Sequence, residues 1–445
     1  LPFGVTGQQG GHAYGLIRLQ PGFYRTDGWQ QSLSQYQSGN TYKNVSIEGM
    51  GDVTVGGTED SFATNHLIRL RGSHISIKNI RLQYTTGIGI LVSPHDPINA
   101  RQSHLLIQDV EIDSVGNFSI LIRNTDTVLV ERCTSLYAAR PFSDTLTTPC
   151  QWPSGVKFYS CNQVAFTHGE IGFTRGEGLN FHNTQYGSGS HNTLHDNSSN
   201  VYCDNGSKVV LRNNLIYTTP GSDPLWGNCP GDPGGKSPGV GILLANENAC
   251  ATGGPVNNNC RTNCPLVGLS YSHVDSIFIY NNFILNCSRA LNLWEGETGV
   301  LGGPNCIKNV FFQHNTVAGY LGDTTRSGFG LIDIFFPAPY NTILGYGYAT
   351  ATNIVVENNL FSYPYKRYAK ILPVRVVRDP LFPVPVELKM NHNRWIVNHS
   401  RLGPDSQVDS TLPATTPIHE SDVLQQWQPC PDQQNLVQSA PASPF

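Results

Sequence analysis

Apolar residues two positions apart recur in short runs along the chain, and the runs return about every 22 residues. The steps from Val156 to Leu179 and from Leu179 to Val201 are 23 and 22 residues. A period of two indicates strands, because alternate side chains of a strand point to the same side. We predict one column of stacked strands whose inward pairs are Ile90/Val92, Ile120/Ile122, Val156/Phe158, Leu179/Phe181, Val201/Cys203, Ile242/Leu244 and Leu291/Leu293.

A second pattern lies between these strands: an apolar residue, a polar corner ending in Asn, and another apolar residue. Clear copies occupy residues 211–216, 279–284, 312–317, 356–361 and 390–395. Asn suits such a corner because it tolerates left-handed backbone angles, and stacked identical amides can form hydrogen-bonded ladders. The pattern therefore predicts two strands that meet at an Asn corner, with one corner in each coil.

Strands this short, on a coil of about 22 residues and without predicted helices, fit few architectures. A propeller repeats at roughly 40–50 residues, and a sandwich needs hairpin turns that are nearly missing here. We predict an all-β, right-handed parallel β-helix (a solenoid) over residues 41–402, after an N-terminal segment and cap in 1–40. A Cys-rich loop insertion near 222–270 and an irregular Pro/Gln/Ser-rich tail at 403–445 complete the expected organisation.

One stretch carries a family resemblance: GEGLNFH at 176–182, HDNSSNVYCDN at 195–205 and VVLRNN at 209–214. It resembles secreted right-handed parallel β-helix repeat proteins with the pectin-lyase-like fold, and the resemblance extends over roughly residues 40 to 400. The resemblance implies the fold. It implies no single function, because the same scaffold carries lyases, hydrolases, epimerases, adhesins and tail spikes.

The composition excludes several classes of function. Charged residues are 13 % of the chain, against about 25 % in an average soluble domain, and the net charge is −4. No basic stripe predicts nucleic-acid binding, and no apolar run approaches the roughly 18 residues of a membrane-spanning helix. Asn, Ser, Thr and Gly replace the missing charge, so the surface is expected to be neutral and polar.

The eleven cysteines indicate an oxidising compartment and hence secretion to the exterior or the cell surface. Cys229, Cys250, Cys260 and Cys264 crowd the predicted insertion without the paired spacing of a zinc site, so we predict disulfides there. An odd count leaves one thiol free or paired between chains. Six Asn-x-Ser sequons are candidate glycosylation sites: Asn44, Asn117, Asn197, Asn205, Asn286 and Asn398.

The residues between the inward pairs should form an outward face with two rows. The His182 row contains Arg123, Tyr159, His182, Asp204, Ala245 and Trp294; the Lys157 row contains Leu121, Lys157, Asn180, Tyr202, Leu243 and Asn292. Coils stack about 4.8 Å apart, so His182 and Asp204 should be neighbours. The candidate catalytic residues are Lys157, His182 and Asp204, and the candidate sugar-binding residues are Arg123, Tyr159, Tyr202 and Trp294. A structural interpretation of the same face remains open.

Other candidate motifs are incomplete. Ser93-Pro-His-Asp96 lacks the first Asp of the Asp-Pro-His-Asp signature of alginate epimerases, and Asn124-Thr-Asp126 lacks the later polygalacturonase motifs. No acidic cluster predicts calcium, and we expect neither a metal nor a cofactor. The polar stretch His168, Glu170, Arg175 and Glu177 is a further candidate, with a solvated turn as its alternative.

Two functions of different class follow. The first is an extracellular structural protein that self-assembles into a filament, sheath or surface layer, with other copies of itself as partners. It rests on low charge, an odd cysteine and the open ends of a β-helix, where the tail at 403–445 would dock on another copy or on its own helix. The second is a polysaccharide-active enzyme, a lyase or epimerase, that acts on an acidic glycan through the Lys157, His182 and Asp204 face.

Overall fold

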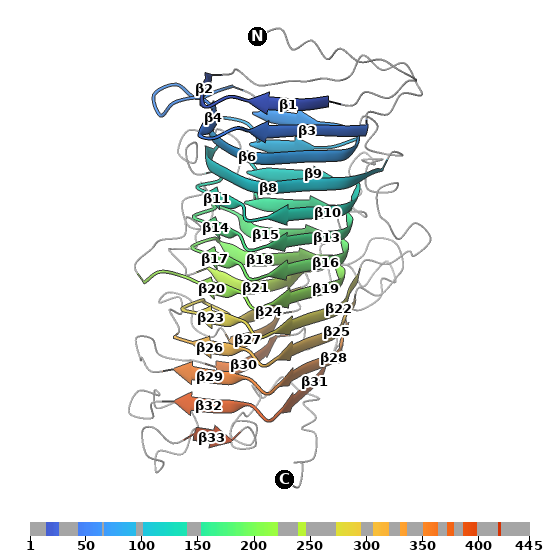
Figure 1. Ribbon diagram of the computed structural model, residues 1–445. Coiled ribbons are helices and arrows are strands. Elements are labelled where there is room, and N and C mark those ends of the chain that lie inside the picture. The colour runs from blue at the N-terminus through green and yellow to red at the C-terminus, as the bar shows by residue number, and fades with distance from the viewer. Residues whose placement is uncertain are drawn as a thin grey trace, which may run out of the picture.

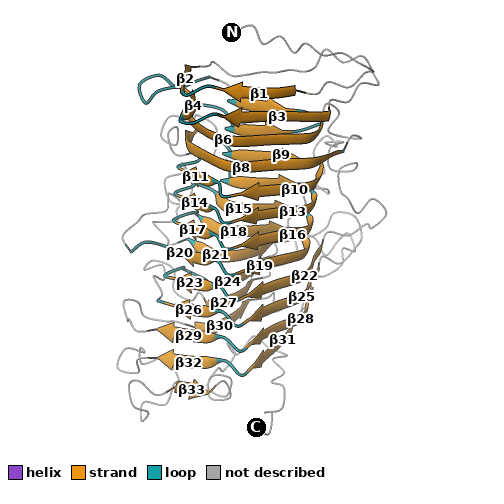
Figure 2. Cartoon of the chain, viewed as in Figure 1, coloured by secondary structure: helices purple, strands orange, loops and turns teal. Residues whose placement is uncertain are grey.

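In a computed structural model of the chain, strands stack along one axis into a right-handed parallel β-helix (Figure 1). The structure describes residues 15–25, 43–64, 66–94, 101–139, 153–220, 239–245, 273–294, 306–319, 330–335, 350–363, 372–377, 386–397 and 417–419. Within these ranges every regular element is a strand (Figure 2), and none is a helix that could cross a membrane. The predicted fold class is confirmed.

Ten strands, one for each of ten coils, form the smaller sheet, and all of them run parallel. Neighbouring members lie one coil apart, so a side chain on one strand stacks on its counterpart in the next. The strands are β5 (Ile68–Leu70), β7 (Ile90–Val92), β9 (Ile120–Arg123), β12 (Val156–Tyr159), β15 (Glu177–His182), β18 (Ser199–Asp204), β21 (Val240–Ala245), β24 (Leu291–Trp294), β27 (Gly330–Phe335) and β30 (Leu372–Val377).

The 23-stranded sheet supplies the other two sides of each coil. Its first column contains β1 (Gly15–Leu19), β3 (Lys43–Gly49), β6 (Ser73–Thr85), β8 (Gln102–Val115), β10 (Thr125–Glu131), β13 (Asn162–Thr167), β16 (Gln185–Ser190), β19 (Ser207–Arg212), β22 (His273–Tyr280), β25 (Cys306–Gln313), β28 (Thr350–Glu357) and β31 (Val386–Asn391). Its second contains β2 (Gly22–Arg25), β4 (Val53–Gly56), β11 (Thr134–Leu136), β14 (Glu170–Gly172), β17 (Thr193–His195), β20 (Leu215–Tyr217), β23 (Phe283–Leu285), β26 (Thr316–Ala318), β29 (Leu360–Tyr363), β32 (Arg394–Val397) and β33 (Pro417–His419).

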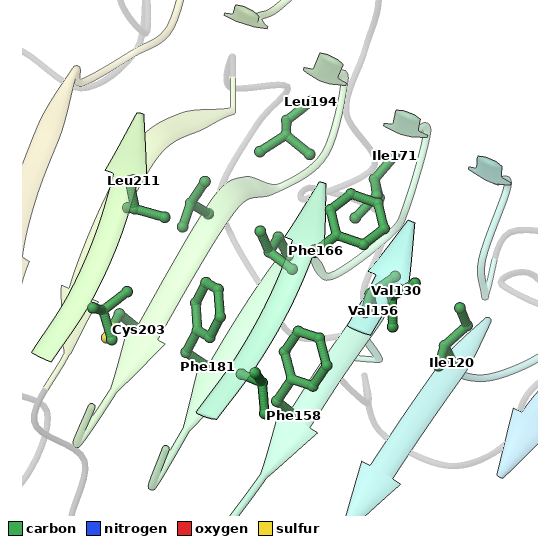
Figure 3. Close-up of a cluster of buried hydrophobic side chains, with 14 of the residues drawn as sticks. Ile120, Val130, Val156, Phe158, Phe166, Ile171, Phe181, Leu194, Cys203 and Leu211 are labelled. Carbon is green, nitrogen blue, oxygen red and sulfur yellow. The ribbon is translucent and has the colours of Figure 1, made fainter. Parts of the chain in front are cut away.

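The interior is a continuous apolar core between the sheets, and every predicted inward pair lies in it. Phe158 pairs with Phe181 in register, and Phe181 pairs with Cys203, so their side chains stack along the axis (Figure 3). The rings of Phe158 and Phe181 lie 5.6 Å apart. The period of two in the sequence thus predicted both the strands and their buried side.

The Asn corners form the predicted ladder. Within each Asn-Asn pair the first residue takes the left-handed conformation, as at Asn281 with φ 55°, and the second turns inward. The inward amides bond from coil to coil, as when Nδ2 of Asn282 donates to Oδ1 of Asn315 at 2.9 Å. The ladder runs through Asn192, Asn214, Asn282, Asn315, Asn359 and Asn393, all of them buried.

The ends and the insertion differ from the sequence-based boundaries. β1 and β2 already pair in parallel with β3 and β4, so the first coil begins at Gly15, inside the segment expected to be a cap. β21 lies within the expected insertion, because Val240–Ala245 continues the smaller sheet. At the other end β33 pairs antiparallel with β32, so this part of the tail covers the last strand of its own helix.

The expectation of one unpaired cysteine is wrong, because Cys133, Cys161, Cys203 and Cys287 are all free and buried. They act as core residues: the thiol of Cys161 donates to the carbonyl of Ile122 at 3.5 Å, and burial raises its pKa to about 12. The four predicted disulfide cysteines, Cys229, Cys250, Cys260 and Cys264, lie outside the described residues. The cysteine count is therefore a weaker sign of secretion than it is when most cysteines form bridges.

Candidate functional site

The smaller sheet places the two predicted rows side by side on its outward face. Lys157 is in register with Asn180, and Asn180 with Tyr202. In the adjacent row Tyr159 is in register with His182, and His182 with Asp204. Inward Leu179 and Phe181 flank Asn180, so the alternation that builds the core also sets these polar side chains on the opposite face.

His182 is held from two sides. Its ring stacks on that of Tyr159 at a centroid distance of 4.7 Å, and its Nδ1 lies 2.9 Å from Oδ2 of Asp204. This is a close approach of the two groups; no hydrogen bond from Nδ1 to Oδ2 accompanies it. Nε2 is buried and has no hydrogen-bond partner within the described part of the chain. The site therefore contains an oriented imidazole with an unused basic nitrogen.

Exposure falls steeply along the His182 row, contrary to the expectation of a uniformly exposed face. Arg123 is exposed and Tyr159 half-buried, whereas His182 is only 8 % exposed and Asp204 fully buried. Sequence alternation distinguishes inward from outward positions, but it does not report what covers the outward ones. A sugar could reach Arg123 and Tyr159 directly, whereas its access to Nε2 of His182 requires atoms above that nitrogen to move.

Lys157 lies above a buried polar network. Oγ of Ser154 donates to Oε2 of Glu177 at 2.9 Å and accepts from Nδ2 of Asn180 at 3.1 Å. Burial raises the pKa of Glu177, although the charges of Lys157 and His182 act in the opposite direction. The solvated-turn alternative is wrong for Glu177. A buried carboxyl with a raised pKa is a proton donor at higher pH than an ordinary Glu.

Two predicted sugar-binding residues have other contacts. Tyr202 is 5 % exposed and packs in an outward apolar cluster with Val240, Leu243 and Ala245, and Trp294 packs against the same cluster. Their rings are thus committed to protein contacts, which leaves less of each ring for a sugar. Arg123 instead lies over the ring of Tyr159 at 5.6 Å and remains exposed. The accessible part of the predicted binding surface is therefore Arg123 and Tyr159, with half-buried Lys157 beside them.

The rest of the polar stretch lies elsewhere. Glu170 is on β14 and contacts Nε2 of His195 at 3.1 Å, and Asp196 contacts Nδ1 of the same ring at 2.9 Å. Burial lowers the pKa of His195, but the hydrogen bonds to the two carboxylates raise this pKa by more than burial lowers it. The net shift of the pKa is therefore upward. This ion cluster has both ring nitrogens occupied, which suits a structural role. His168 is exposed and stacks on His191 at 4.9 Å.

Asn197 cannot accept a glycan in the folded chain. It is fully buried, and its Nδ2 already donates to the carbonyl of Ile171 and to Oδ1 of Asn200. Asn205 is buried as well, whereas Asn117 and Asn286 are half-buried. The structure describes no side chain for Asn44, and Asn398 lies outside the described residues, as do His95 and Asp96 of the epimerase-like motif.

Among the described residues no group of three or more His, Cys, Asp or Glu side chains converges on a possible metal position. Glu177 is the residue of the site that sequence reasoning assigned elsewhere. It precedes Leu179 by two positions on β15, but Gly178 also faces the interior, so strict alternation fails there and gives no parity signal for Glu177. Its bonding to Ser154 depends on the register of two coils, which no local pattern shows.

The sequence matches no protein-family model and no curated protein. Among solved structures it is similar to two A-modules of mannuronan C-5 epimerases from Azotobacter vinelandii. The AlgE4 module is 11 % identical, with a TM-score of 0.40, over 82 % of this chain and 91 % of that one. The AlgE6 module is 12 % identical, with a TM-score of 0.39, over 86 % of each chain. At these values the likeness says nothing about activity.

Proposed function

We propose that this protein is a polysaccharide-active enzyme, a lyase or an epimerase, that acts on an acidic glycan at His182. The observation that carries the proposal is the buried Nε2 of His182, which has no partner in the described structure while Oδ2 of Asp204 lies 2.9 Å from the other ring nitrogen. An unpaired buried polar atom costs about 1–3 kcal/mol. Such a cost is common where a group is kept ready for a substrate.

Lyases and epimerases of uronate polymers share their first step, which suits this arrangement. A base removes the hydrogen at C5 as a proton, and the electron pair of that bond moves into the adjacent carboxylate. In elimination the pair then forms the C4–C5 double bond and expels the glycosidic oxygen at C4, which takes a proton from an acid. In epimerisation an acid returns a proton to C5 from the opposite face.

Each role has a candidate among the residues of the site. Nε2 of His182 is the base, and Asp204 fixes the orientation of the ring and stabilises the imidazolium. Lys157 and Arg123 supply positive charge for the substrate carboxylate, where negative charge accumulates in the transition state. Glu177, whose pKa is raised by burial, is the candidate acid. The ring of Tyr159 supplies a flat, half-exposed surface for a sugar.

The structural alternative is not carried further. The tail was expected to dock on another copy or on its own helix, and its described part, β33, pairs with β32 of the same chain. Secretion remains part of the enzyme proposal, because an acidic polysaccharide is an extracellular substrate.

The test compares His182→Gln with His168→Gln, a matched change at an exposed histidine on the other sheet. Each variant is incubated with polyuronates that differ in sugar. Elimination is followed by the ultraviolet absorbance of the unsaturated product, and epimerisation by deuterium incorporation at C5 in heavy water. We expect His182→Gln to reduce turnover by about 10²–10⁴-fold and His168→Gln to leave it unchanged. Unaltered turnover by His182→Gln, or no product and no exchange with the unmodified protein, would refute the proposal.

A further inference from the structure

Two arginines at the N-terminal end of the same outward face have no ion-pair partner among the described residues. Arg69 is the middle residue of β5 and Arg71 follows that strand, while Ile68 and Leu70 fill the core between them. Both arginines are half-buried, and the Nε atom of each is buried without a hydrogen-bond partner in the described part of the chain. No described carboxylate forms an ion pair with either guanidinium.

Other arginines of the molecule form ion pairs with carboxylates. Arg81 pairs with Glu111 at 2.7 Å, Arg132 with Asp109 at 2.7 Å and Arg289 with Asp333 at 2.9 Å. The first two pairs are on exposed surface, where an arginine could stay solvated without a partner. Arg69 and Arg71 are less accessible to water, so a bound counter-charge would stabilise them more than it would an exposed arginine.

The positive groups around these two arginines repel one another. Burial and the charge of Arg69 lower the pKa of Arg71, and the same two causes lower the pKa of His66. Nδ1 of His66 accepts a hydrogen bond from the backbone N–H of Ile88 at 3.1 Å, so in the neutral ring Nε2 carries the hydrogen and can donate. Two neighbouring guanidinium groups and an imidazole N–H donor thus lie close together, and a bound anion would reduce the repulsion between them.

The register connects this cluster to the candidate active site. Arg69 is aligned with Leu91, Leu91 with Leu121, and Leu121 with Lys157. Four coil steps separate β5 from β15, so Arg69 and Arg71 lie roughly 19 Å from His182 along the axis. The outward side of the strands between them contains a buried apolar cluster of Ile88, Leu91 and Leu121, with Phe118 and Tyr159 packed against it.

We propose that Arg69 and Arg71 form an anion-binding site that takes a carboxylate or sulfate group of an acidic glycan, several sugars away from the residue at His182. Each guanidinium can bind such a group through two parallel hydrogen bonds. That the ligand is a glycan rests on the proposed function. That the two arginines bind an anion rests on the arginines themselves and is independent of that function.

The test measures binding without turnover, in a His182→Gln background. Arg69→Gln/Arg71→Gln is compared with Arg81→Gln/Arg132→Gln, which removes the same charge from the other sheet. Calorimetry follows uronate oligomers of increasing length and, separately, sodium sulfate. For oligomers long enough to span both sites we expect the first pair to weaken binding about 10–100-fold, the equivalent of one charged hydrogen bond at about 1.5–3 kcal/mol. Shorter oligomers should lose less, and the control pair should stay within about twofold.

Equal affinities in the two double variants would overturn the proposal. So would a site that binds sulfate as strongly as any oligomer, because that result would indicate a small inorganic anion. Loss of binding in Arg69→Gln/Arg71→Gln without any turnover by the unmodified protein would reject the proposed function and keep this site. Because the two substitutions remove repelling charges, the thermal unfolding midpoint should be unchanged or higher, which separates lost binding from lost folding.

Discussion

The outward faces of the two sheets are built on the same interior, yet they differ in how their charged side chains are paired. On the 23-stranded sheet, charged side chains on neighbouring coils pair with one another. Examples are Arg18–Glu48, Arg81–Glu111, Arg101–Asp126, Arg132–Asp109 and Lys308–Asp275. These pairs are largely exposed to solvent, and each contributes little to stability.

Among the described residues, the ten-stranded sheet has buried polar atoms without a hydrogen-bond partner: Nε2 of His182, Oδ1 of Asn180, Oδ1 of Asn292 and Nε of Arg69 and Arg71. The 23-stranded sheet has such atoms at Gln102, Ser135 and Asn162, but no guanidinium or imidazole among them. Buried polar atoms are nearly always hydrogen-bonded in folded proteins. Stability therefore does not explain this face, and its unpaired groups are the strongest indication that a ligand completes it. The comparison supports the proposal that the ligand binds on one side of a solenoid whose core is uniform.

The largest expected effect tests whether inward and outward residues of one strand contribute differently to the free energy of unfolding. Leu293 and Asn292 are neighbours on β24, Leu293 in the core and Asn292 outward with its Oδ1 unpaired. Leu293→Ala should lower the free energy of unfolding by about 2–5 kcal/mol, because it leaves a cavity. Asn292→Leu should change it by less than about 1 kcal/mol or raise it, because an unsatisfied amide is removed. Denaturant titration measures both, and a large loss in Asn292→Leu would contradict the comparison.

A smaller effect concerns the satisfied polar groups of the core. Asn282 accepts from the backbone N–H of Asn214 and donates to the carbonyl of Leu211, both at 3.0 Å. Asn282→Ala leaves these groups unpaired in the interior, so we expect a loss of about 1–3 kcal/mol in the free energy of unfolding. Asn281→Gly is the control, because glycine accepts the left-handed backbone of that corner. If both variants unfold at the same denaturant concentration, the ladder does not stabilise the helix.

The smallest effect is a pH dependence that belongs to the ten-stranded sheet. The pKa of Glu177 is raised in the folded chain, above an unfolded value of 4.5, because burial disfavours the carboxylate. Its contribution to stability is fully present below the unfolded pKa and is lost as the pH rises through the folded one. Relative to Glu177→Gln, the unmodified protein should lose up to about 1.4 kcal/mol per pH unit over that interval. Unfolding measured from about pH 4 to about pH 8 tests this, and parallel curves would show that Glu177 is ordinarily ionised.

The amino-acid sequence determined the coil, the inward residues and the Asn ladder. It could do so because these features repeat: Leu179 and Val201 occupy equivalent positions, and each Asn-Asn pair reports its own backbone conformation locally. The same repetition aligned His182 with Asp204 and Lys157 with Asn180. Register in a solenoid follows from counting, so residues one coil apart can be matched without knowledge of the rest of the fold.

Only the tertiary structure decided how much water reaches the outward positions and which charges find partners. Parity placed His182 and Asp204 outward, yet both are buried. Nothing local distinguishes Arg69, which has no partner in the described part of the chain, from Arg81, whose partner Glu111 is 30 residues away. The free cysteines and the pairing of β33 with β32 also could not be read from local sequence. Burial and pairing depend on segments distant in sequence, whereas strand formation and facing depend on neighbours two residues or one coil away.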